Sequence, residues 1–185
     1  MNASVSVCQG DVRNAPVEAI ELKTPVLVRR RALRDDSGGP GKFRGGLGQE
    51  TLAENRVEGR WNLSNAGRSI EPPWGLAGGK SGVRSKNLVR RPGEPDFQEA
   101  LVYRQNFDAG AQVIVRTAGG GGWGSPLERD PSQVLDDVLE GYVSIQSAHD
   151  DYGVVIKDEQ LDEKSTLAVR SRMKAHSPSL FEGRD

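Results

Sequence analysis

Apolar and polar residues alternate over short runs in the first two thirds of the chain, a pattern that predicts β-strands. These runs are bounded by Gly, Pro, Asn or Asp, which interrupt strands and close turns. Strands are predicted at residues 25–33, 48–58, 60–64, 86–91, 97–106 and 111–117, with a short helical turn at 17–21. Strands at this spacing are typical of a mainly antiparallel framework, either a sandwich or a partial barrel.

Helical periodicity begins only after residue 125. Asp130 supplies an N-cap, Pro131 suits the first helical position, and Gly141 supplies a stop. The apolar residues between them share one helical face, at positions Val134, Leu135, Val138 and Leu139. Further elements are expected at 144–152 (helix), 154–156 (a brief strand or a packed connector) and about 161–175 (helix).

The two patterns together predict an α+β fold. A β-rich domain with glycine-rich loops is expected over residues 1–125, and a small helical segment over 126–176. Residues 177–185 are expected to form a flexible tail, since chain ends are poorly ordered unless they are tied down.

Three glycine-rich segments punctuate the strand region, at residues 35–48, 72–82 and 118–126. Six glycines fall between Gly38 and Gly48 alone. Glycine reaches positive φ without steric cost and lets backbone N–H groups approach a ligand closely. The segments therefore predict three shaped loops that are presented by a strand framework.

The composition narrows the possible partners. Apolar residues make up 35% of the 185 residues, so the core is thin and another chain or missing sequence could complete it. A net charge of −1, from 25 basic and 26 acidic residues, favours neither nucleic acid nor a membrane surface. The longest apolar run, at 100–103, is too short to span a membrane. A single cysteine, Cys8, excludes an internal disulfide and fits the reducing cytoplasm.

Two phosphate-binding motifs are approximated but incomplete. Residues 79–81 read Gly-Lys-Ser, but Trp74 stands where a phosphate loop needs its first glycine. The glycines in 119–124 match the dinucleotide spacing, yet Pro126 interrupts the helix that should follow them. A tight crossover with Trp123 packed over it is the better interpretation of that segment.

Metal binding has little support in the sequence. The residues His149, His176 and Cys8 lie far apart, so they do not form a zinc site. His149 stands beside two aspartates in an acidic helix, where a solvated surface position is expected.

Asp11, Arg13 and Asn14 precede Pro16 on a segment that is expected to bend. Turn formation combined with a surface ion pair explains these residues as well as a catalytic role does. The sequence by itself leaves both alternatives open.

Taken in order, several motifs resemble the hydantoinase B/oxoprolinase family. They are GDVRNAPVE at 10–18, DSGGPG at 36–41, FRGGLG at 43–48, PPWGLAGG at 72–79, GGGGWGSPLERDP at 119–131 and YGVV at 152–155. The resemblance covers residues 10 to about 175, and it corresponds only to the C-terminal part of the family's longer chains. The larger N-terminal region is expected to supply most metal and catalytic groups.

The resemblance implies ATP-dependent hydrolysis of a cyclic amide, of the hydantoin or 5-oxoproline type, by a hetero-oligomer. The partners would be a hydantoinase A-like ATPase subunit and the missing N-terminal hydantoinase B region. ATP and a divalent metal would serve the complete complex, with no cofactor bound by this chain. An ATP-dependent ketone carboxylase and a non-catalytic assembly module are the alternatives, and the isolated chain is expected to be inactive.

The resemblance also implies roles for individual residues. Catalytic roles fall on Asp11, Arg13 and Asn14, and no metal ligand is assigned. The expected substrate-binding residues are Ser37, Gly38, Gly39, Arg44, Gly45, Trp74, Gly75, Gly120 and Gly121. Backbone N–H groups in such loops stabilise anionic oxygens, and an arginine adds charge-assisted hydrogen bonds.

Overall fold

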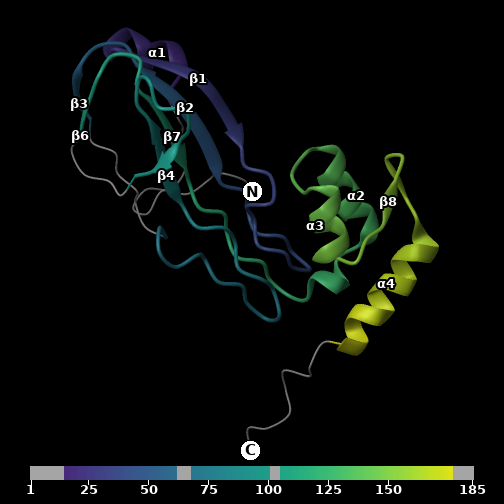
Figure 1. Ribbon diagram of the computed structural model, residues 1–185. Coiled ribbons are helices and arrows are strands. Elements are labelled where there is room, and N and C mark those ends of the chain that lie inside the picture. The colour runs from purple at the N-terminus through teal and green to yellow at the C-terminus, as the bar shows by residue number, and fades with distance from the viewer. Residues whose placement is uncertain (1–14, 62–67, 101–104, 177–185) are drawn as a thin grey trace, which may run out of the picture.

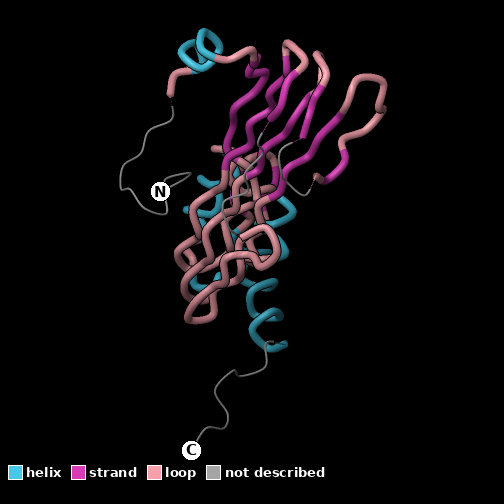
Figure 2. Tube along the Cα trace, turned by 90° about the vertical axis from the view of Figure 1, so that its left-hand side faces the viewer, coloured by secondary structure: helices cyan, strands magenta, loops and turns pink. Residues whose placement is uncertain are grey.

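The computed structural model describes residues 15–61, 68–100 and 105–176 of the chain. An antiparallel sheet lies at one end, loops without regular secondary structure extend from it, and a group of short helices lies at the other end (Figures 1 and 2). This arrangement confirms the predicted α+β fold. No helix among these residues is long and apolar enough to cross a membrane.

The main sheet has five antiparallel strands in the order β1-β2-β7-β4-β5. Helix α1 (Val17–Lys23) precedes it, and a separate two-stranded sheet pairs β3 with β6. The strands are β1 (Val26–Leu33), β2 (Gln49–Asn55), β3 (Gly59–Trp61), β4 (Lys86–Arg90), β5 (Gln98–Glu99), β6 (Gln105–Phe107) and β7 (Gln112–Arg116). All of them overlap strands predicted from the sequence, although β3 begins one residue before its predicted range and β6 ends one residue after it.

Side-chain alternation explains why these strands form a sheet. Ala53, Val113 and Val89 are direct neighbours across three strands, and two of them lie in a buried cluster with Phe107 and Ala111. Successive residues point to opposite faces of a sheet. The other face accordingly carries charged pairs such as Arg116 and Glu50, whose Nε and Oε2 atoms lie 2.6 Å apart.

The prediction of one continuous strand at 97–106 was wrong, because the segment contains parts of two strands, β5 and β6. Strand β5 pairs with β4 in the main sheet, whereas β6 pairs with β3 in the second sheet. A regular apolar pattern does not reveal where a chain leaves one sheet for another, because both segments alternate in the same way.

The C-terminal half contains a group of short elements that we call the helical module, residues 126–176. It comprises the 3-10 turn η1 (Pro126–Glu128), α2 (Pro131–Leu139), α3 (Ile145–Asp150), the hairpin β8 (Ile156–Lys157) and β9 (Gln160–Leu161), and α4 (Glu163–His176). As predicted, Asp130 caps α2 by accepting a hydrogen bond from the Ser132 N–H. Gly141 and Gly153 follow α2 and α3 in the left-handed region, which suits glycine.

The sequence predicted Leu161 at the start of the last helix, but it lies in β9. A two-residue turn at Asp158 and Glu159 folds β9 back onto β8. The sequence offered no glycine or asparagine there to indicate a tight hairpin turn.

The start of α4 depends on the carboxylate of Asp162. Lys157 and both the N–H and the hydroxyl of Ser165 donate hydrogen bonds to it, at 2.8–2.9 Å. These bonds hold the pKa of Asp162 well below its usual value, with the Lys157 hydrogen bond as the main cause.

We therefore expect α4 to weaken as the pH falls. A carboxyl whose pKa is depressed in the folded state stabilises that state above its unfolded pKa, about 3.9, and loses this contribution as the pH falls toward the folded value. Hydrogen exchange of the α4 amides, corrected for the intrinsic rate, should accelerate between about pH 5 and pH 3. In Asp162→Ala, α4 should already exchange fast at about pH 5, and the acid-induced change should shrink. An equal acid response in both proteins would contradict the assignment.

Two separate hydrophobic clusters lie at the two ends of the molecule. One is the sheet cluster around Val113, and the other lies in the helical module around Val134 and Tyr152. Between them lie the three glycine loops, residues 37–48, 72–85 and 117–125, which we call the glycine bundle. This arrangement explains the low fraction of apolar residues, because backbone contacts replace side-chain packing in the middle of the protein.

Candidate functional site

Backbone hydrogen bonds connect the three loops of the glycine bundle to one another. The Gly39 N–H donates to the Gly120 carbonyl at 2.8 Å, and the Gly120 N–H donates to the Gly46 carbonyl at 2.8 Å. The loop at residues 72–85 joins them through Lys80, whose N–H donates to the Pro40 carbonyl at 2.7 Å and whose carbonyl accepts from the Gly122 N–H at 3.0 Å. The loops that the sequence predicted therefore form one assembly.

The loops approach each other so closely that no side chain fits between them. A Cβ atom on Gly121 would lie 1.8 Å from the Trp74 carbonyl oxygen, and one on Gly45 would lie 2.1 Å from the Gly120 oxygen. Real Cβ atoms essentially never come within 3.0 Å of such atoms. Glycine is required here for the close approach of one backbone to another.

The predicted substrate-binding glycines lie inside this assembly. Gly38, Gly39 and Gly45 are buried, and the N–H of Gly45 donates to the Gly39 carbonyl at 2.9 Å. Several of the N–H groups that could have held an anion are thus already bonded to carbonyls. A ligand-binding role for Gly38, Gly39, Gly45, Gly75, Gly120 and Gly121 stays a prediction, and the geometry assigns most of them a packing role.

Arg44, whose substrate-binding role stays a prediction, reaches into the helical module. Its Nε and one Nη atom lie 3.1 and 3.2 Å from the two carboxylate oxygens of Asp137, which is 93 residues away in sequence. Arg129 binds the same carboxylate at 2.9 Å. All three side chains are about nine-tenths buried. We call Arg44, Asp137 and Arg129 the arginine clamp, because it joins the bundle to α2.

Ser37 and Trp74, the two remaining predicted substrate residues, differ in their surroundings. The Ser37 hydroxyl is buried, donates to the Arg34 carbonyl at 2.6 Å and accepts from the Gly48 N–H at 2.9 Å. Trp74 is exposed, and the Arg68 guanidinium lies 4.5 Å from its ring centroid. Of the two, only Trp74 has a side chain that an incoming molecule can reach.

The predicted catalytic residues Asp11, Arg13 and Asn14 lie outside the described residues, as do Cys8 and the predicted tail at 177–185. Their roles stay predictions. Residues 15–61 follow directly and lead through α1 and β1 into the first loop of the bundle.

An exposed apolar ridge runs along one side of the bundle. Phe43 and Trp123 form a mutual backbone pair, and their rings lie 5.6 Å apart. Leu76 bridges to Trp123 from the loop at residues 72–85, and all three side chains are about half exposed. The prediction that Trp123 packs over the crossover is therefore met only in part. A grouped, exposed Trp and Phe are typical of a protein contact surface.

A polar cavity of about 400 Å³ lies where the bundle meets α3. Lys80 crosses it, with its Nζ 2.7 Å from an oxygen of Asp151, whose other oxygen accepts from the Ser147 hydroxyl at 2.7 Å. On the loop side, an Asp36 oxygen accepts the Ser144 N–H at 2.8 Å. The residues Gly79, Lys80 and Ser81 thus form part of a contact between loop and helix, in agreement with the rejection of a phosphate loop.

The described residues show neither a phosphate cradle at residues 79–81 nor a cluster of three metal-ligating side chains. Lys80 is bound to a carboxylate, and the Gly79 N–H is bonded to the Leu76 carbonyl, so no phosphate cradle is available there. Within residues 15–61, 68–100 and 105–176, no three His, Cys, Asp or Glu side chains are grouped as metal ligands. His149 lies on the surface, with Nδ1 2.7 Å from Asp150, and hydrogen bonds from His149 and Gln146 lower the pKa of Asp150.

The sequence pattern assigned no individual role to Asp137, Arg129 or Tyr152. Asp137 stands three residues after Val134 and next to Val138, within the apolar face of α2, and a charged residue in that position was the available signal. The Tyr152 hydroxyl is fully buried without a hydrogen-bond partner among the described residues, and burial raises its pKa. A neutral phenol at the centre of the module is the consequence.

The family assignment rests on this glycine-rich region. Residues 1–126 match the hydantoinase B/oxoprolinase family. The chain belongs to this family. It is 39% identical to the beta chain of the caprolactamase from Pseudomonas jessenii over 173 residues, covering 89% of this chain and 29% of that protein. It is 32% identical to the putative B-type subunit of a D-/L-hydantoinase from a Pseudomonas species, covering 90% of this chain and 28% of that protein.

The fold agrees with that of a solved family member. A nucleotide-free structure of acetone carboxylase, from work on ATP-dependent acetone carboxylation, superposes with a TM-score of 0.80 at 25% identity. The match covers 95% of this chain and 28% of that one. The chain therefore spans less than a third of the relatives it matches, so the activity of a whole family enzyme is a proposal for it.

Proposed function

We propose that this chain is the C-terminal part of a hydantoinase B-type subunit that contributes to ATP-dependent hydrolysis of a cyclic amide. The observation that carries the proposal is the glycine bundle, which falls within the family match and retains loop-to-loop distances that only glycine permits. The relatives named hydantoinase and caprolactamase favour a cyclic amide, and the relative described as ATP-dependent favours ATP.

Within that enzyme, the bundle is a rigid support and not the centre that binds nucleotide or metal. Its polar groups are largely committed to one another, as in the arginine clamp and the loop-to-loop hydrogen bonds. The apolar ridge of Phe43, Leu76 and Trp123 is the surface that the remaining hydantoinase B region would cover. The other partner is a hydantoinase A-like ATPase subunit, with ATP and a divalent metal held outside this chain, in the cytoplasm.

A second candidate is a purely structural module in the same assembly. It is favoured by the buried Ser37 hydroxyl and by the engagement of Arg44 with Asp137. An ATP-dependent ketone carboxylase is the alternative reaction for a catalytic assembly, supported by the match to acetone carboxylase.

Turnover by the reconstituted complex tests the proposal. The chain is combined with a hydantoinase B N-terminal region and a hydantoinase A-type subunit, and ring opening of caprolactam, hydantoin and 5-oxoproline is followed with and without ATP. We expect ATP-dependent opening of one of them, and a loss of about tenfold or more in Arg13→Ala and Asn14→Ala. The isolated chain should be inactive.

The controls separate the candidates. Leu22→Ser, at an exposed position on α1, should leave both assembly and turnover unchanged. Full turnover by intact complexes of Arg13→Ala and Asn14→Ala would leave only the structural module. Bicarbonate-dependent consumption of acetone, without ring opening, would replace the hydrolase by a carboxylase.

A further inference from the structure

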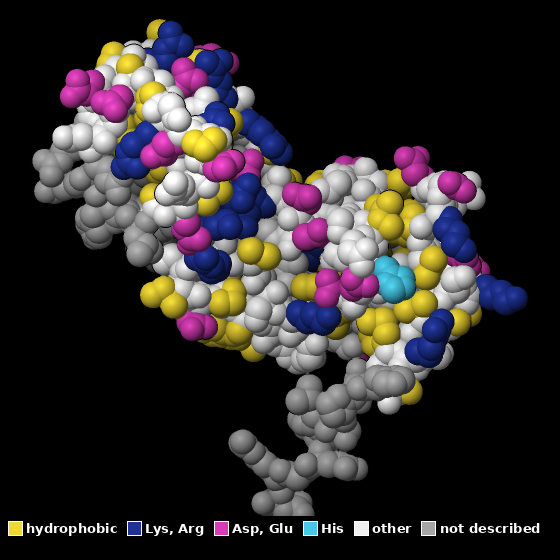
Figure 3. Space-filling model, in the orientation of Figure 1, with side chains coloured by type: hydrophobic (Ala, Val, Ile, Leu, Met, Phe, Trp, Pro, Cys, Tyr) yellow, Lys and Arg dark blue, Asp and Glu magenta, His cyan; other side chains and the backbone are white. Residues whose placement is uncertain are grey.

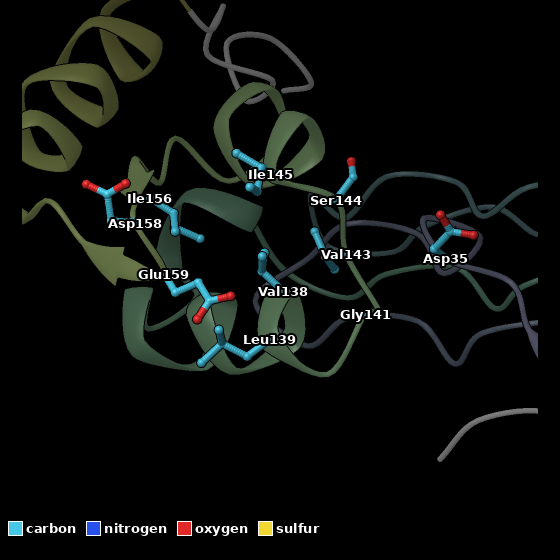
Figure 4. Close-up of a pocket in the computed structure, with 10 residues that line it drawn as sticks. All are labelled: Asp35, Val138, Leu139, Gly141, Val143, Ser144, Ile145, Ile156, Asp158 and Glu159. Carbon is cyan, nitrogen blue, oxygen red and sulfur yellow. The ribbon is translucent and has the colours of Figure 1, made fainter.

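A second cavity, of about 390 Å³, opens on the helical module (Figure 4). Its apolar lining comes from α2, the connection between α2 and α3, α3 and β8, which contribute Val138, Leu139, Val143, Ile145 and Ile156. We call it the α2–α3 groove. Figure 4 shows these side chains between two acidic positions, Asp35 at one end and Glu159 at the other.

Two of the apolar side chains in the groove are exposed. Leu139 is 54% exposed and Ile145 is 59% exposed, although Val143 and Ile156 beside them are buried. Large apolar side chains that border a concave surface favour association with another apolar group. The groove is therefore suited to receive an apolar side chain.

Three carboxylates border the groove, and one of them, Asp35, interacts electrostatically with its sequence neighbour Arg34. None of Asp35, Asp158 and Glu159 forms an ion pair with any residue that the structure describes. In Figure 4 the Glu159 carboxylate points toward Val138 and Leu139, whereas that of Asp158 points away. Figure 3 shows both acidic and basic side chains at this end of the molecule, and the basic residue of β8, Lys157, pairs with Asp162. An occupant with positive charge at its two ends would complement this arrangement.

The turn that presents Glu159 is strained. Asp158 and Glu159 have φ values of 48° and 59°, in the left-handed region that a two-residue hairpin of this kind requires at both positions. Asn-Gly is the favoured pair there, and a glutamate incurs a steric cost that glycine avoids. The turn keeps the Glu159 carboxylate beside the groove despite this cost.

We propose that the α2–α3 groove is a docking site for a segment of a separate polypeptide that carries an apolar anchor between two basic residues. The apolar floor would hold the anchor, and Asp35 and Glu159 would pair with the flanking Lys or Arg side chains. A nucleic acid would be repelled by the same carboxylates. The inference concerns binding and does not depend on the reaction of the complete enzyme.

Fluorescence polarisation with a synthetic peptide tests this proposal. The probe is a fluorescein-labelled 12-residue peptide with a Leu-Ile pair flanked on each side by lysines, and its control has glutamates in place of the lysines. The full chain should bind the lysine peptide in a salt-dependent manner and should not bind the glutamate peptide. Ile145→Ser should weaken binding about tenfold or more, as expected for loss of a central apolar contact.

Three variants separate docking from folding. Glu159→Gly removes the charge and relieves the turn, so the melting temperature should rise while peptide binding weakens. Glu159→Gln should weaken binding without relieving the turn. Leu167→Ser, on α4 and 68% exposed, is the matched apolar control and should bind like the unmodified chain.

Three outcomes would overturn the proposal. The first is equal binding of the lysine and glutamate peptides. The second is unchanged binding in both Ile145→Ser and Glu159→Gly. The third is concentration-dependent self-association of the unmodified chain, seen by sedimentation and lost in Glu159→Gln, which would make a second copy the occupant.

Discussion

Replacing Gly119 by alanine is expected to prevent the glycine loops from packing. The added Cβ would lie 1.9 Å from the carbonyl oxygen of Ser37 and 2.4 Å from its carbonyl carbon. Both atoms belong to the backbone, so neither can rotate away as a flexible side chain could. We expect a loss of more than about 4 kcal/mol in the free energy of unfolding, which exceeds the usual effect of a point substitution.

Urea unfolding of a graded series measures this effect. A Cβ on Gly120 would have its nearest contact at 3.2 Å, and one on Gly59 would meet nothing within 4 Å. The loss of stability should therefore decrease from Gly119→Ala to Gly120→Ala and should be smallest in Gly59→Ala. A similar midpoint for Gly119→Ala and Gly59→Ala would show that the loops do not touch as described.

Removing the carboxylate of Asp137 is expected to cause the second-largest loss. Arg44 and Arg129 would then stand nearly buried without their counter-charge. Breaking a buried ion pair by removing one partner typically costs about 3–5 kcal/mol, because the remaining charge stays desolvated. Asp137→Ala should lose about this much, and the contact between the bundle and α2 should loosen.

The neighbouring Asp136 provides the matched control, since it is exposed on the same helix. Asp136→Ala should change the urea midpoint little. A triple variant that combines Asp137→Leu with Arg44→Met and Arg129→Met would replace the charges by an apolar contact. It should recover most of the lost stability, because replacing a buried ion network by apolar side chains is often neutral or stabilising. A triple variant as unstable as Asp137→Ala would mean that the clamp contributes more than charge compensation.

The elements that are specified by residues close together in the sequence were predicted well. Helix α2 has its cap at Asp130, its apolar face around Val134 and its stop at Gly141, and all three lie within one short segment. The strands β1, β2, β4 and β7 were predicted because alternation and turn residues are also local. The failures were the segment at 97–106, which divides between two sheets, and Leu161, which joins a hairpin that lacks the usual turn residues.

The candidate site was predicted only in outline. The sequence located the three glycine loops and, through the order of their motifs, the family to which the chain belongs. It did not show that Arg44 binds Asp137, because no periodicity links two residues 93 positions apart. The substrate-binding role of Arg44 was implied by the family resemblance, and only its surroundings in the fold reveal that Asp137 binds its guanidinium.

The sequence by itself determined where the chain forms strands, helices and glycine loops, because propensity, capping and alternation act between near neighbours. The tertiary structure alone decided what the glycines do. A glycine has no side chain whose pattern could indicate a partner, so the contact of Gly121 with Trp74, or of Gly119 with Ser37, becomes visible only when distant backbones are brought together.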